Sequence, residues 1–527
     1  MKFHQLNHAA IAVLTFALGG ACLATAQENN GSSWTMFGQN PSNTASAGAG
    51  SGISVGNAAR LTKKWVATTG GDVSARAAVA GGAVFFPDWG GNLWALKTSD
   101  GSKIWSHQFS DYVTGAAAGS IHSRSTPAVV DGVLYIGTQE GGWLMAIRAA
   151  NGALLWKTQV EPSDPLAVLT ASPVVVDGII YGGVASLQEG AAANPAFPCC
   201  TARGSVYAVL ASTGDIVWKT YTVPTGYSGG GVWGSNAVVD EDSNTLFVGT
   251  GNNYTRPASV RACISAGSPE SACLSPDDHV DSILALDLRH GNIKWSKRLT
   301  GGDDWNVGCI VAVQTNCPST PNPAGPDYDF SSAPNLFTVA GPHGPRKILG
   351  AGQKSGLYSA FDPATGAILW QTQVGPGSSL GGIEWGSATD GKRIYVNITN
   401  LYGIPYAAGN AGSVAALDAA TGAILWQKAD PNGAIDLGPV AVANGVVFTP
   451  SMAGGATTPN MFALDAATGK QLWSFASGGS VIAGASIAGG TVYWGSGYAH
   501  IAVPGFVGNN QFYAFAAPGG DNSGNDQ

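Results

Sequence analysis

Two sets of residues in the sequence have side chains suited to binding and redox chemistry. The first set consists of carboxylates and amides, whose oxygen atoms are the ligands that a hard cation such as Ca²⁺ prefers: Glu189, Asn252, Asp303, Asp304 and Asn306. The second set combines cationic, hydroxyl and indole side chains, which suit a flat anion with several carboxylates: Arg124, Lys354, Thr170, Ser172, Trp233 and Trp385. Taken singly, each residue could equally serve a turn or a local ion pair.

A repeated signature shows which elements could bring these residues together. A Trp follows a Gly by four residues seven times, in segments such as DGSKIW, ending at Trp105, and ATGAILW, ending at Trp426. A degenerate eighth copy ends at Trp65. Upstream hairpins such as PAVVDGVLYIGT place Asp-Gly, Asn-Gly or Gly-Gly between two β-branched runs. Two hairpins per repeat predict an all-β, eight-bladed β-propeller of four-stranded antiparallel blades. We expect each Trp of the repeat to pack between blades, and the strand over 511–516 to complete the first blade.

The same order of strands and turns predicts that the two faces of the propeller differ. With strands A to D in each blade, the short A–B and C–D turns lie on one face, and the B–C and D–A connections lie on the other. The long segments LQEGAAANPAFPCCTARG, GTGNNYTRP and GAGQKSG follow B strands, whereas IHSRSTP, VLTASP, GGGVWGSN and GGDDWNVGC precede A strands. The candidate residues should therefore converge on one rim around the central channel.

The N-terminus has the pattern of a secretory signal peptide. Lys2 is followed by the apolar run 9–18, and Ala24-Thr25-Ala26 resembles a cleavage site. Beyond this signal, six cysteines fall in three close pairs, which in an exported chain favours disulfides. We expect Cys263–Cys273 and Cys309–Cys317, while Cys199 and Cys200 either form a vicinal bridge or stay reduced. These features predict a periplasmic or secreted protein without a membrane span.

Charge and motifs exclude two other possibilities. Charged residues make up 11% of the chain, the formal net charge is −8, and Lys and Arg form no runs, so nucleic-acid binding has little electrostatic basis. No Cys-x-x-Cys-His motif occurs in these residues, so covalent haem is not expected in them.

The blades resemble those of the PQQ-dependent alcohol dehydrogenases (quinoproteins), and WTMFGQNPSNT resembles their opening segment. GGIEWGSATDGKRIYV and GGDDWN resemble the polyvinyl alcohol dehydrogenase branch more narrowly. The resemblance implies PQQ and Ca²⁺ as cofactors and assigns roles by motif. Arg124, Thr170, Trp233, Lys354 and Trp385 would bind PQQ, and Glu189 and Asn252 would bind the metal.

Two departures from the family pattern affect the expected mechanism. Methanol-type members have Trp-Asp, with that Asp as the proposed base, where this chain has Trp305-Asn306. Asp303, Asp304 or another carboxylate such as Glu384 would have to act instead, with Asp303 favoured. Methanol-type members also place their adjacent cysteines before the counterpart of Arg124, whereas Cys199-Cys200 follows Glu189.

The expected activity is oxidation of alcohols, possible substrates being secondary alcohols and polyvinyl alcohol, with electrons passed to a separate cytochrome c. A non-enzymatic propeller acting as an extracytoplasmic scaffold or binding module is one rival, favoured by Asn306. A PQQ enzyme for sugars or small primary alcohols is another. The expected organisation is a signal peptide over 1–26, a segment packing on the propeller over 27–57, the propeller over 58–517 and a disordered tail over 518–527.

Overall fold

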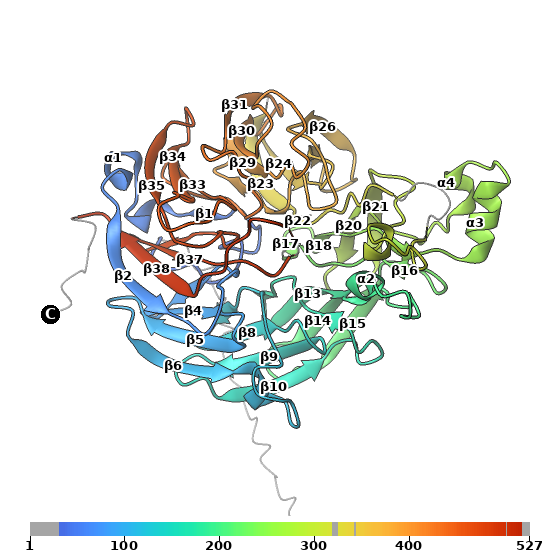
Figure 1. Cartoon of the computed structure of the whole chain (residues 1–527), viewed down its shortest axis with the longest axis horizontal. Coiled ribbons are helices and arrows are strands. Elements are labelled where there is room, and N and C mark those ends of the chain that lie inside the picture. The colour runs from blue at the N-terminus through green and yellow to red at the C-terminus, as the bar shows by residue number, and fades with distance from the viewer. Residues whose placement is uncertain (1–30, 235, 319–324, 342–343, 502, 519–527) are drawn as a thin grey trace, which may run out of the picture.

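The structure, a computed structural model, describes residues 31–234, 236–318, 325–341, 344–501 and 503–518. Within them, eight antiparallel sheets of four main strands follow one another around a ring, which confirms the predicted eight-bladed propeller. Figure 1 views this ring down the shortest axis of the molecule. The predicted signal peptide lies outside the described residues.

The first four blades use their strands in chain order, from the innermost strand outward. Blade 1 is β3 (Ala78–Ala80), β4 (Ala83–Pro87), β5 (Asn92–Lys97) and β6 (Lys103–Gln108); blade 2 is β7 (Ala128–Val130), β8 (Val133–Gly137), β9 (Trp143–Arg148) and β10 (Leu154–Gln159). Blade 3 is β12 (Val174–Val176), β13 (Ile179–Ser186), β14 (Ser205–Leu210) and β15 (Ile216–Tyr221), with β11 (Ala167–Val168) added to β13. Blade 4 is β17 (Val238–Asp240), β18 (Thr245–Gly249), β20 (Ser282–Asp287) and β21 (Ile293–Arg298).

The last four blades repeat this order, and the final one closes the ring. Blade 5 is β23 (Asn335–Gly341), β24 (Gly344–Gly352), β25 (Leu357–Phe361) and β26 (Ile368–Gln373); blade 6 is β28 (Ala388–Thr389), β29 (Arg393–Ile398), β30 (Ser413–Asp418) and β31 (Ile424–Ala429). Blade 7 is β32 (Ala441–Ala443), β33 (Val446–Pro450), β34 (Met461–Asp465) and β35 (Gln471–Phe475). Blade 8 joins β36 (Ser486–Ala488), β37 (Thr491–Gly495) and β38 (Gln511–Ala516) to the N-terminal β2 (Thr62–Thr68), so 511–516 completes the sheet that holds Trp65, as predicted.

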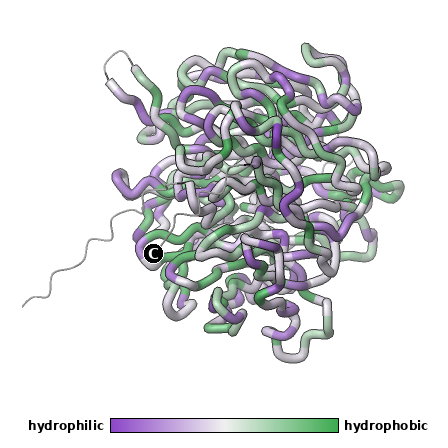
Figure 2. Tube along the Cα trace, turned by 90° about the vertical axis from the view of Figure 1, so that its left-hand side faces the viewer, coloured by the Kyte–Doolittle hydropathy of each residue, from purple (hydrophilic) through white to green (hydrophobic). Residues whose placement is uncertain are grey.

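Few elements lie outside the blades. The helices are η1 (Ala49–Ser51), α1 (Val55–Ala58), η2 (Phe109–Tyr112), α2 (Gln188–Ala191), α3 (Ala258–Ser265), α4 (Glu270–Cys273) and η3 (Val307–Cys309). Short strands pair as β16 (Ser228–Gly229) with β19 (Asn253–Thr255), and β22 (Ser332–Ala333) in parallel with β27 (Trp385–Gly386). None of the helices in the described part is long and apolar enough to span a bilayer. In the side view of Figure 2, hydrophobic and hydrophilic segments are interspersed over the whole chain.

The Trp and Gly of the repeat meet across neighbouring blades. Trp426 Nε1 donates a hydrogen bond to the carbonyl of Ala466 in the next blade, at 3.0 Å. A Cβ atom added to Gly422 would lie 2.3 Å from the ring of Trp370 in the preceding blade, so no side chain fits there. Trp473 in blade 7 donates to Leu61, just before β2, and thereby joins the ends of the ring. The Trp residues of the repeat therefore pack between blades, as expected.

The two predicted faces are present. Asp131 and Gly132 both have positive φ, 49° and 75°, as the two-residue turn of a tight hairpin requires. The Gly132 carbonyl of this A–B turn accepts the amide of Ala149 at the C–D turn of the same blade, at 2.9 Å. The short turns thus share one face, the turn face, and the B–C and D–A connections form the opposite one, the rim.

Residues 31–47 form a hub along the inner strands. Trp34 bridges to β3, and the carbonyls of residues 35, 41, 42, 44 and 45 accept amides from the inner strands of blades 2, 4, 5, 6 and 7. β1 (Ser46–Ala47) then pairs in parallel with β32. The hub lines the propeller's axis and brings Phe37 to the floor of the pocket described below.

Candidate active site

Glu189 and Asn252, the predicted metal ligands, lie on the same rim in blades 3 and 4. Glu189 is in α2, in the B–C connection of blade 3, and Asn252 follows β18. A hydrogen bond links Glu189 to Tyr254, two residues beyond Asn252. Burial and the nearby charge of Asp329 raise the pKa of Glu189 to about 8. Tyr254 therefore links half-buried Glu189 to the segment that contains buried Asn252.

The side-chain amide of Asn252 is only partly hydrogen-bonded. Its Nδ2 donates to the carbonyls of Trp305 (2.8 Å) and Asn253 (3.1 Å), and its backbone amide donates to Asp329 Oδ1 (2.8 Å). Its Oδ1 is buried without a hydrogen-bond partner among the described residues. A buried amide oxygen without a partner carries a desolvation cost that a bound cation would remove.

Lys354 lies at the centre of a cluster of buried carboxylates. Its Nζ contacts Asp327 Oδ1 at 3.0 Å and Asp329 Oδ2 at 3.1 Å, and the side chain is 5% exposed. Burial lowers the pKa of Lys354, but Asp327 and Asp329 outweigh that effect and hold it well above its usual value. Burial also raises the pKa of Asp327 well above its usual value, although Lys354 opposes this. Asp327 and Asp329 therefore contact the ammonium group, and the charges of Glu384 and Glu189 also act on it.

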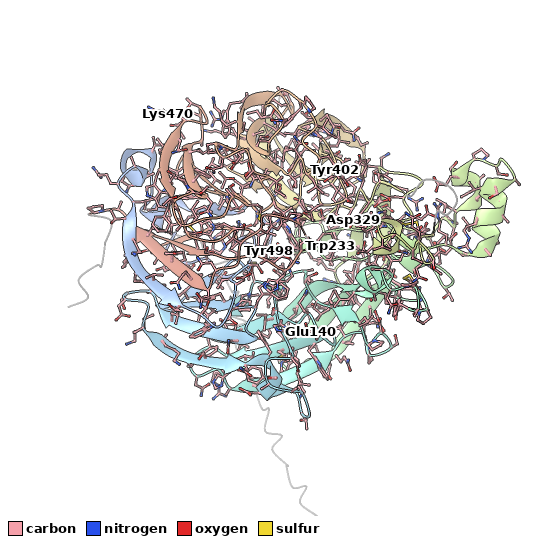
Figure 3. The ribbon with its side chains drawn as sticks, in the orientation of Figure 1. Glu140, Trp233, Asp329, Tyr402, Lys470 and Tyr498 are labelled. Atoms are coloured by element: carbon pink, nitrogen blue, oxygen red, sulfur yellow. A yellow bond between two sulfur atoms is a disulfide. The ribbon has the colours of Figure 1, made fainter. Side chains whose placement is uncertain are left out.

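Trp233 joins this cluster to the channel. Its Nε1 donates to Asp329 Oδ2 at 2.9 Å, and Lys354 Nζ lies 5.0 Å from the centroid of its ring. The predicted contact residue Thr170 donates its hydroxyl to the Trp233 carbonyl at 2.9 Å. Figure 3 shows Trp233 and Asp329 near the middle of the ring, with Lys470 at the periphery.

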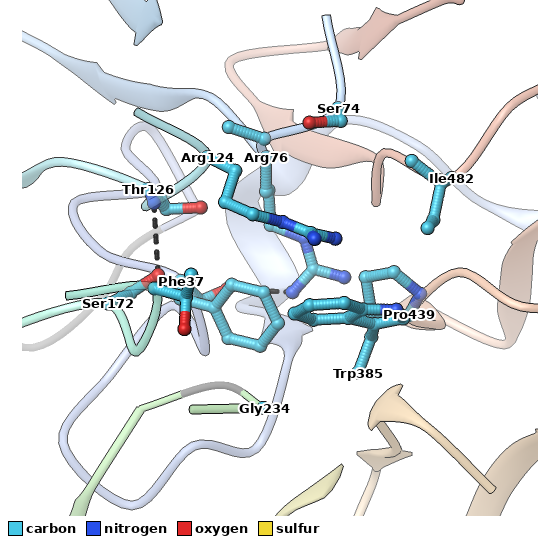
Figure 4. A pocket seen from close by; sticks show the side chains of 12 residues that line it. Phe37, Ser74, Arg76, Arg124, Thr126, Ser172, Gly234, Trp385, Pro439 and Ile482 are labelled. Atoms are coloured by element: carbon cyan, nitrogen blue, oxygen red, sulfur yellow. Dashed lines mark hydrogen bonds between the residues drawn. The ribbon is translucent and has the colours of Figure 1, made fainter. Parts of the chain in front are cut away.

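A narrow pocket beside Trp233 is lined by two arginines. Arg124 and Arg76 both extend toward Trp385, as Figure 4 shows. The guanidinium carbon of Arg124 lies 4.0 Å from the Trp385 ring centroid, and the rings of Trp385 and Trp233 meet edge to face at 5.3 Å. Ser172 also lines the pocket and accepts the amide of Thr126 at 2.9 Å, the dashed line in Figure 4. The predicted cofactor-binding residues thus come together.

Arg76 is a pocket residue that sequence reasoning missed. It is fully buried, and its Nη atoms donate to the backbone carbonyls of Phe37 (2.7 Å) and Val440 (2.9 Å). Burial lowers its pKa to about 9, and it makes no ion pair with a described residue. Arg76 is therefore a second candidate cation of this pocket besides Arg124.

Trp385 has a strained backbone. Its φ is 60°, in the left-handed region that bulky residues rarely adopt. The bridge between Ser332 and Trp385, in the parallel pair β22 and β27, fixes this conformation. Such strain is concentrated at functional sites, where the surrounding structure enforces it.

The three residues predicted for catalysis have structural partners. Both oxygens of Asp303 accept backbone amides, those of Asp327 (2.9 Å) and Tyr328 (2.5 Å). Asp304 Oδ1 pairs with Arg256 Nη2 at 2.6 Å. Asn306 caps η3 by accepting the amide of Gly308 at 2.8 Å. They lie beside the cluster, and their predicted catalytic roles remain predictions.

Asp327 and Asp329 are the carboxylates that sequence reasoning overlooked. They form an Asp-Tyr-Asp motif in the segment PDYDFSS, between β21 and β22. The segment lies outside the Gly-x-x-x-Trp repeat, so the repeat did not predict its position on the rim. The close spacing of two Asp residues before the Lys354 segment was the available signal.

The predicted disulfides Cys263–Cys273 and Cys309–Cys317 are present, and Cys199–Cys200, which the sequence left open, also forms a disulfide. The vicinal pair lies between α2 and η3: Cys200 Sγ is 3.7 Å from the carbonyl of Gln188, and Cys199 Sγ is 3.7 Å from Asn306 Nδ2. It therefore borders the Glu189 side of the site.

Comparisons with known proteins agree with this geometry. The family model of outer membrane protein assembly factor BamB matches residues 43–197 and 410–522. Polyvinyl alcohol dehydrogenases from Pseudomonas sp. and Sphingopyxis sp. (strain 113P3) are each 30% identical, over 85% of this chain and 70% of theirs. The crystal structure of quinohemoprotein alcohol dehydrogenase from Comamonas testosteroni aligns with a TM-score of 0.70 and 20% identity, over 93% of this chain and 81% of that one.

The propeller, with its rim of carboxylates, cations and indoles, defines an oxidoreductase of the quinoprotein class. The chain belongs to the family of PQQ-dependent alcohol dehydrogenases that includes the polyvinyl alcohol dehydrogenases.

Proposed function

We propose that the protein, loaded with PQQ and Ca²⁺, oxidises secondary alcohols, polyvinyl alcohol among them, to ketones. The observation that carries the proposal is the partnerless Oδ1 of Asn252 beside a surplus of buried carboxylates. PQQ, when bound, supplies a two-electron oxidant, and Ca²⁺ supplies a Lewis acid.

Glu189 and Asn252 would hold the cation. No group of three or more His, Cys, Asp or Glu side chains in the described ranges is arranged to hold an ion. The two residues would therefore supply part of the ligand set, since Ca²⁺ takes six to eight oxygen ligands. The positive charge would lower the pKa of Glu189 and Asp327, which burial raises, and so reduce the cost of burying them.

Arg76 and Arg124 would hold the carboxylates of PQQ at the opposite end of the site from Lys354. Trp233 and Trp385 would offer flat surfaces to its ring system, with Thr170 held against Trp233 by its hydrogen bond. A planar tricarboxylate matches this distribution of cations around indoles.

The geometry favours Asp327 as the general base. Asp303, which the sequence favoured, uses both oxygens for backbone amides, and Asp329 is engaged by Trp233, Lys354 and Asn252. Asp327 uses Oδ1 for Lys354, and its Oδ2 takes no hydrogen bond from a described residue. Asp327 Oδ2 would accept the proton of the substrate hydroxyl, while Lys354 keeps the carboxylate in position.

The proposal extends to location and electron acceptor. The signal-like N-terminus supports export to the periplasm or beyond, and the absence of Cys-x-x-Cys-His from the sequence supports a separate cytochrome c as acceptor. The relatives named polyvinyl alcohol dehydrogenase support the polymer as a substrate.

The test is reconstitution of purified protein with PQQ and Ca²⁺, followed by dye reduction with secondary alcohols. We expect turnover that depends on both additions and is abolished in Glu189→Ala. Absence of turnover in a protein that still folds would favour a scaffold role instead, which the match to the BamB model makes the leading rival.

A further inference from the structure

A second cluster of rings lies on the rim between blades 8, 1 and 2, and we call its members Trp89, His122 and His500 the rim platform. Trp89 follows β4, His122 precedes β7, and His500 follows β37. The rings of Trp89 and His500 stack at 4.0 Å, and those of Trp89 and His122 lie 5.9 Å apart. No motif or role considered so far accounts for this cluster.

Each histidine of the platform is held by a carboxylate. His500 Nε2 lies 3.2 Å from Asp72 Oδ2, and His122 Nδ1 lies 3.1 Å from Glu140 Oε1. Asp72 is itself anchored by the backbone amides of Ala499 (3.0 Å) and Asn509 (2.7 Å). This leaves His500 Nδ1 and His122 Nε2 without a hydrogen bond to a described residue. The two side chains are 35% and 24% exposed, so solvent reaches both imidazole rings.

The platform is continuous with the cofactor pocket through Tyr498. The Tyr498 ring lies 5.7 Å from that of His500 and 6.2 Å from that of Trp89. Arg124 lies over Tyr498 at 5.4 Å and over Trp385 at 4.0 Å, which connects the platform to the pocket floor. These contacts place the rim platform beside the pocket on the same rim.

Apolar side chains lie around the rim platform and the pocket. Trp89, Ile501 and Phe506 are partly buried and pack against the cluster that contains Trp385 and Tyr498. Leu380 and Ile435 pack against the same cluster from the opposite blades. Imidazole nitrogens and apolar side chains therefore lie together beside the pocket, which is the chemistry needed by a carbon chain that bears hydroxyl groups at intervals.

We infer that the rim platform is a subsite for the neighbouring units of a polyhydroxylated carbon chain, with His122 and His500 bonding its hydroxyls and Trp89 contacting its methylene carbons. The inference rests on the proposed function for the reaction itself. Its consequence is selectivity for long chains: the platform adds binding energy that a short alcohol cannot reach.

The test compares 2,4-pentanediol with polyvinyl alcohol in the reconstituted enzyme. In His122→Ala/His500→Ala and in Trp89→Leu, we expect KM for the polymer to rise about five- to tenfold, the effect of one or two lost hydrogen bonds or contacts. Both kinetic parameters for 2,4-pentanediol should stay within about twofold of the wild type, because binding energy is lost only for the long substrate.

His290→Ala is the matched control. His290 pairs with Asp287 at 3.0 Å, as His500 pairs with Asp72, but it belongs to a C–D turn on the opposite face. This variant should bind and oxidise the polymer as the wild type does. An unchanged polymer KM in the platform variants, or an equal rise for 2,4-pentanediol, would overturn the subsite.

Gel electrophoresis through a matrix containing polyvinyl alcohol measures polymer binding without turnover. It therefore tests the subsite separately from the proposed alcohol oxidation. Wild-type protein should be retarded by the polymer, and the platform variants should run faster than His290→Ala. Retardation without any alcohol oxidation would reject the proposed function and keep the subsite. Oxidation of 2,4-pentanediol with equal retardation of all variants would reject the subsite alone.

Discussion

The two faces of the propeller are built from one repeat, but they differ in how much their connections vary. On the turn face, two-residue turns such as Asp131-Gly132 recur from blade to blade. On the rim, the B–C connection is 88–91 in blade 1 but 187–204 in blade 3, and the second contains Glu189. The turn face contains the Trp–Gly contacts that join neighbouring blades, whereas the rim contains the candidate site residues. The regular repeat therefore determines the fold, whereas the connections that vary between blades contain the candidate site residues.

The strongest test of this contrast is Asp327→Asn on the rim. Loss of the proposed base should lower kcat about 10²- to 10⁴-fold, while binding of PQQ and thermal unfolding change little. Steady-state dye reduction and absorbance of bound PQQ would measure this. The matched variant is Asp303→Asn; if it loses activity and Asp327→Asn does not, the choice made from sequence was correct.

Lys354→Met should show that the buried carboxylates of the rim depend on the Lys354 ammonium group for stability. Removing the ammonium group leaves Asp327 and Asp329 buried without it, which should lower the free energy of unfolding by about 3–5 kcal/mol in cofactor-free protein. Lys347→Met, which breaks a more exposed pair with Asp240 and Asp242 on the turn face, should cost about 0–1 kcal/mol in the same urea titration. Equal losses would contradict the contrast.

On the turn face, Gly422→Ala should affect stability and not turnover. The new Cβ would lie 2.3 Å from the Trp370 ring at a φ of 76°, so overpacking should cost about 1–3 kcal/mol in urea unfolding. Gly433→Ala is the control for backbone strain alone, because its φ is 71° with no atom within 4 Å of the new Cβ. A comparable loss in both variants would show that backbone conformation, and not the Trp–Gly contact, matters.

Glu384 offers a test of the rim that depends on pH. Burial raises its pKa to about 8, although Lys354 and Arg124 oppose the shift, from an unfolded value of 4.5. Between these values the folded state keeps a proton that the unfolded chain releases, so stability falls as pH rises through this window. Glu384→Gln cannot titrate and should lose less stability than the wild type when the pH of the urea titration rises across it. Parallel pH curves for the two proteins would refute this assignment.

The repeat made most of the fold predictable. The Trp and Gly positions indicated the number of blades, and the Asp-Gly and Asn-Gly turns indicated which connections share a face. Glu189, Asn252 and Arg124 could be placed on the rim because each lies next to a recognisable hairpin. Asp327, Arg76 and Trp89 could not be singled out in the same way. Their importance comes from what they contact across blades, and contact depends on side-chain direction that periodicity does not contain.

The central claim is that blades 3 and 4 offer Glu189 and Asn252 to one cation that also holds PQQ. Equilibrium dialysis of PQQ with and without Ca²⁺ tests it most directly, using wild-type protein, Glu189→Ala and Asn252→Ala. The account predicts that Ca²⁺ tightens PQQ binding in the wild type and has no such effect in either variant. If Ca²⁺ strengthened PQQ binding equally in all three proteins, the metal would lie elsewhere and the proposed site would be wrong.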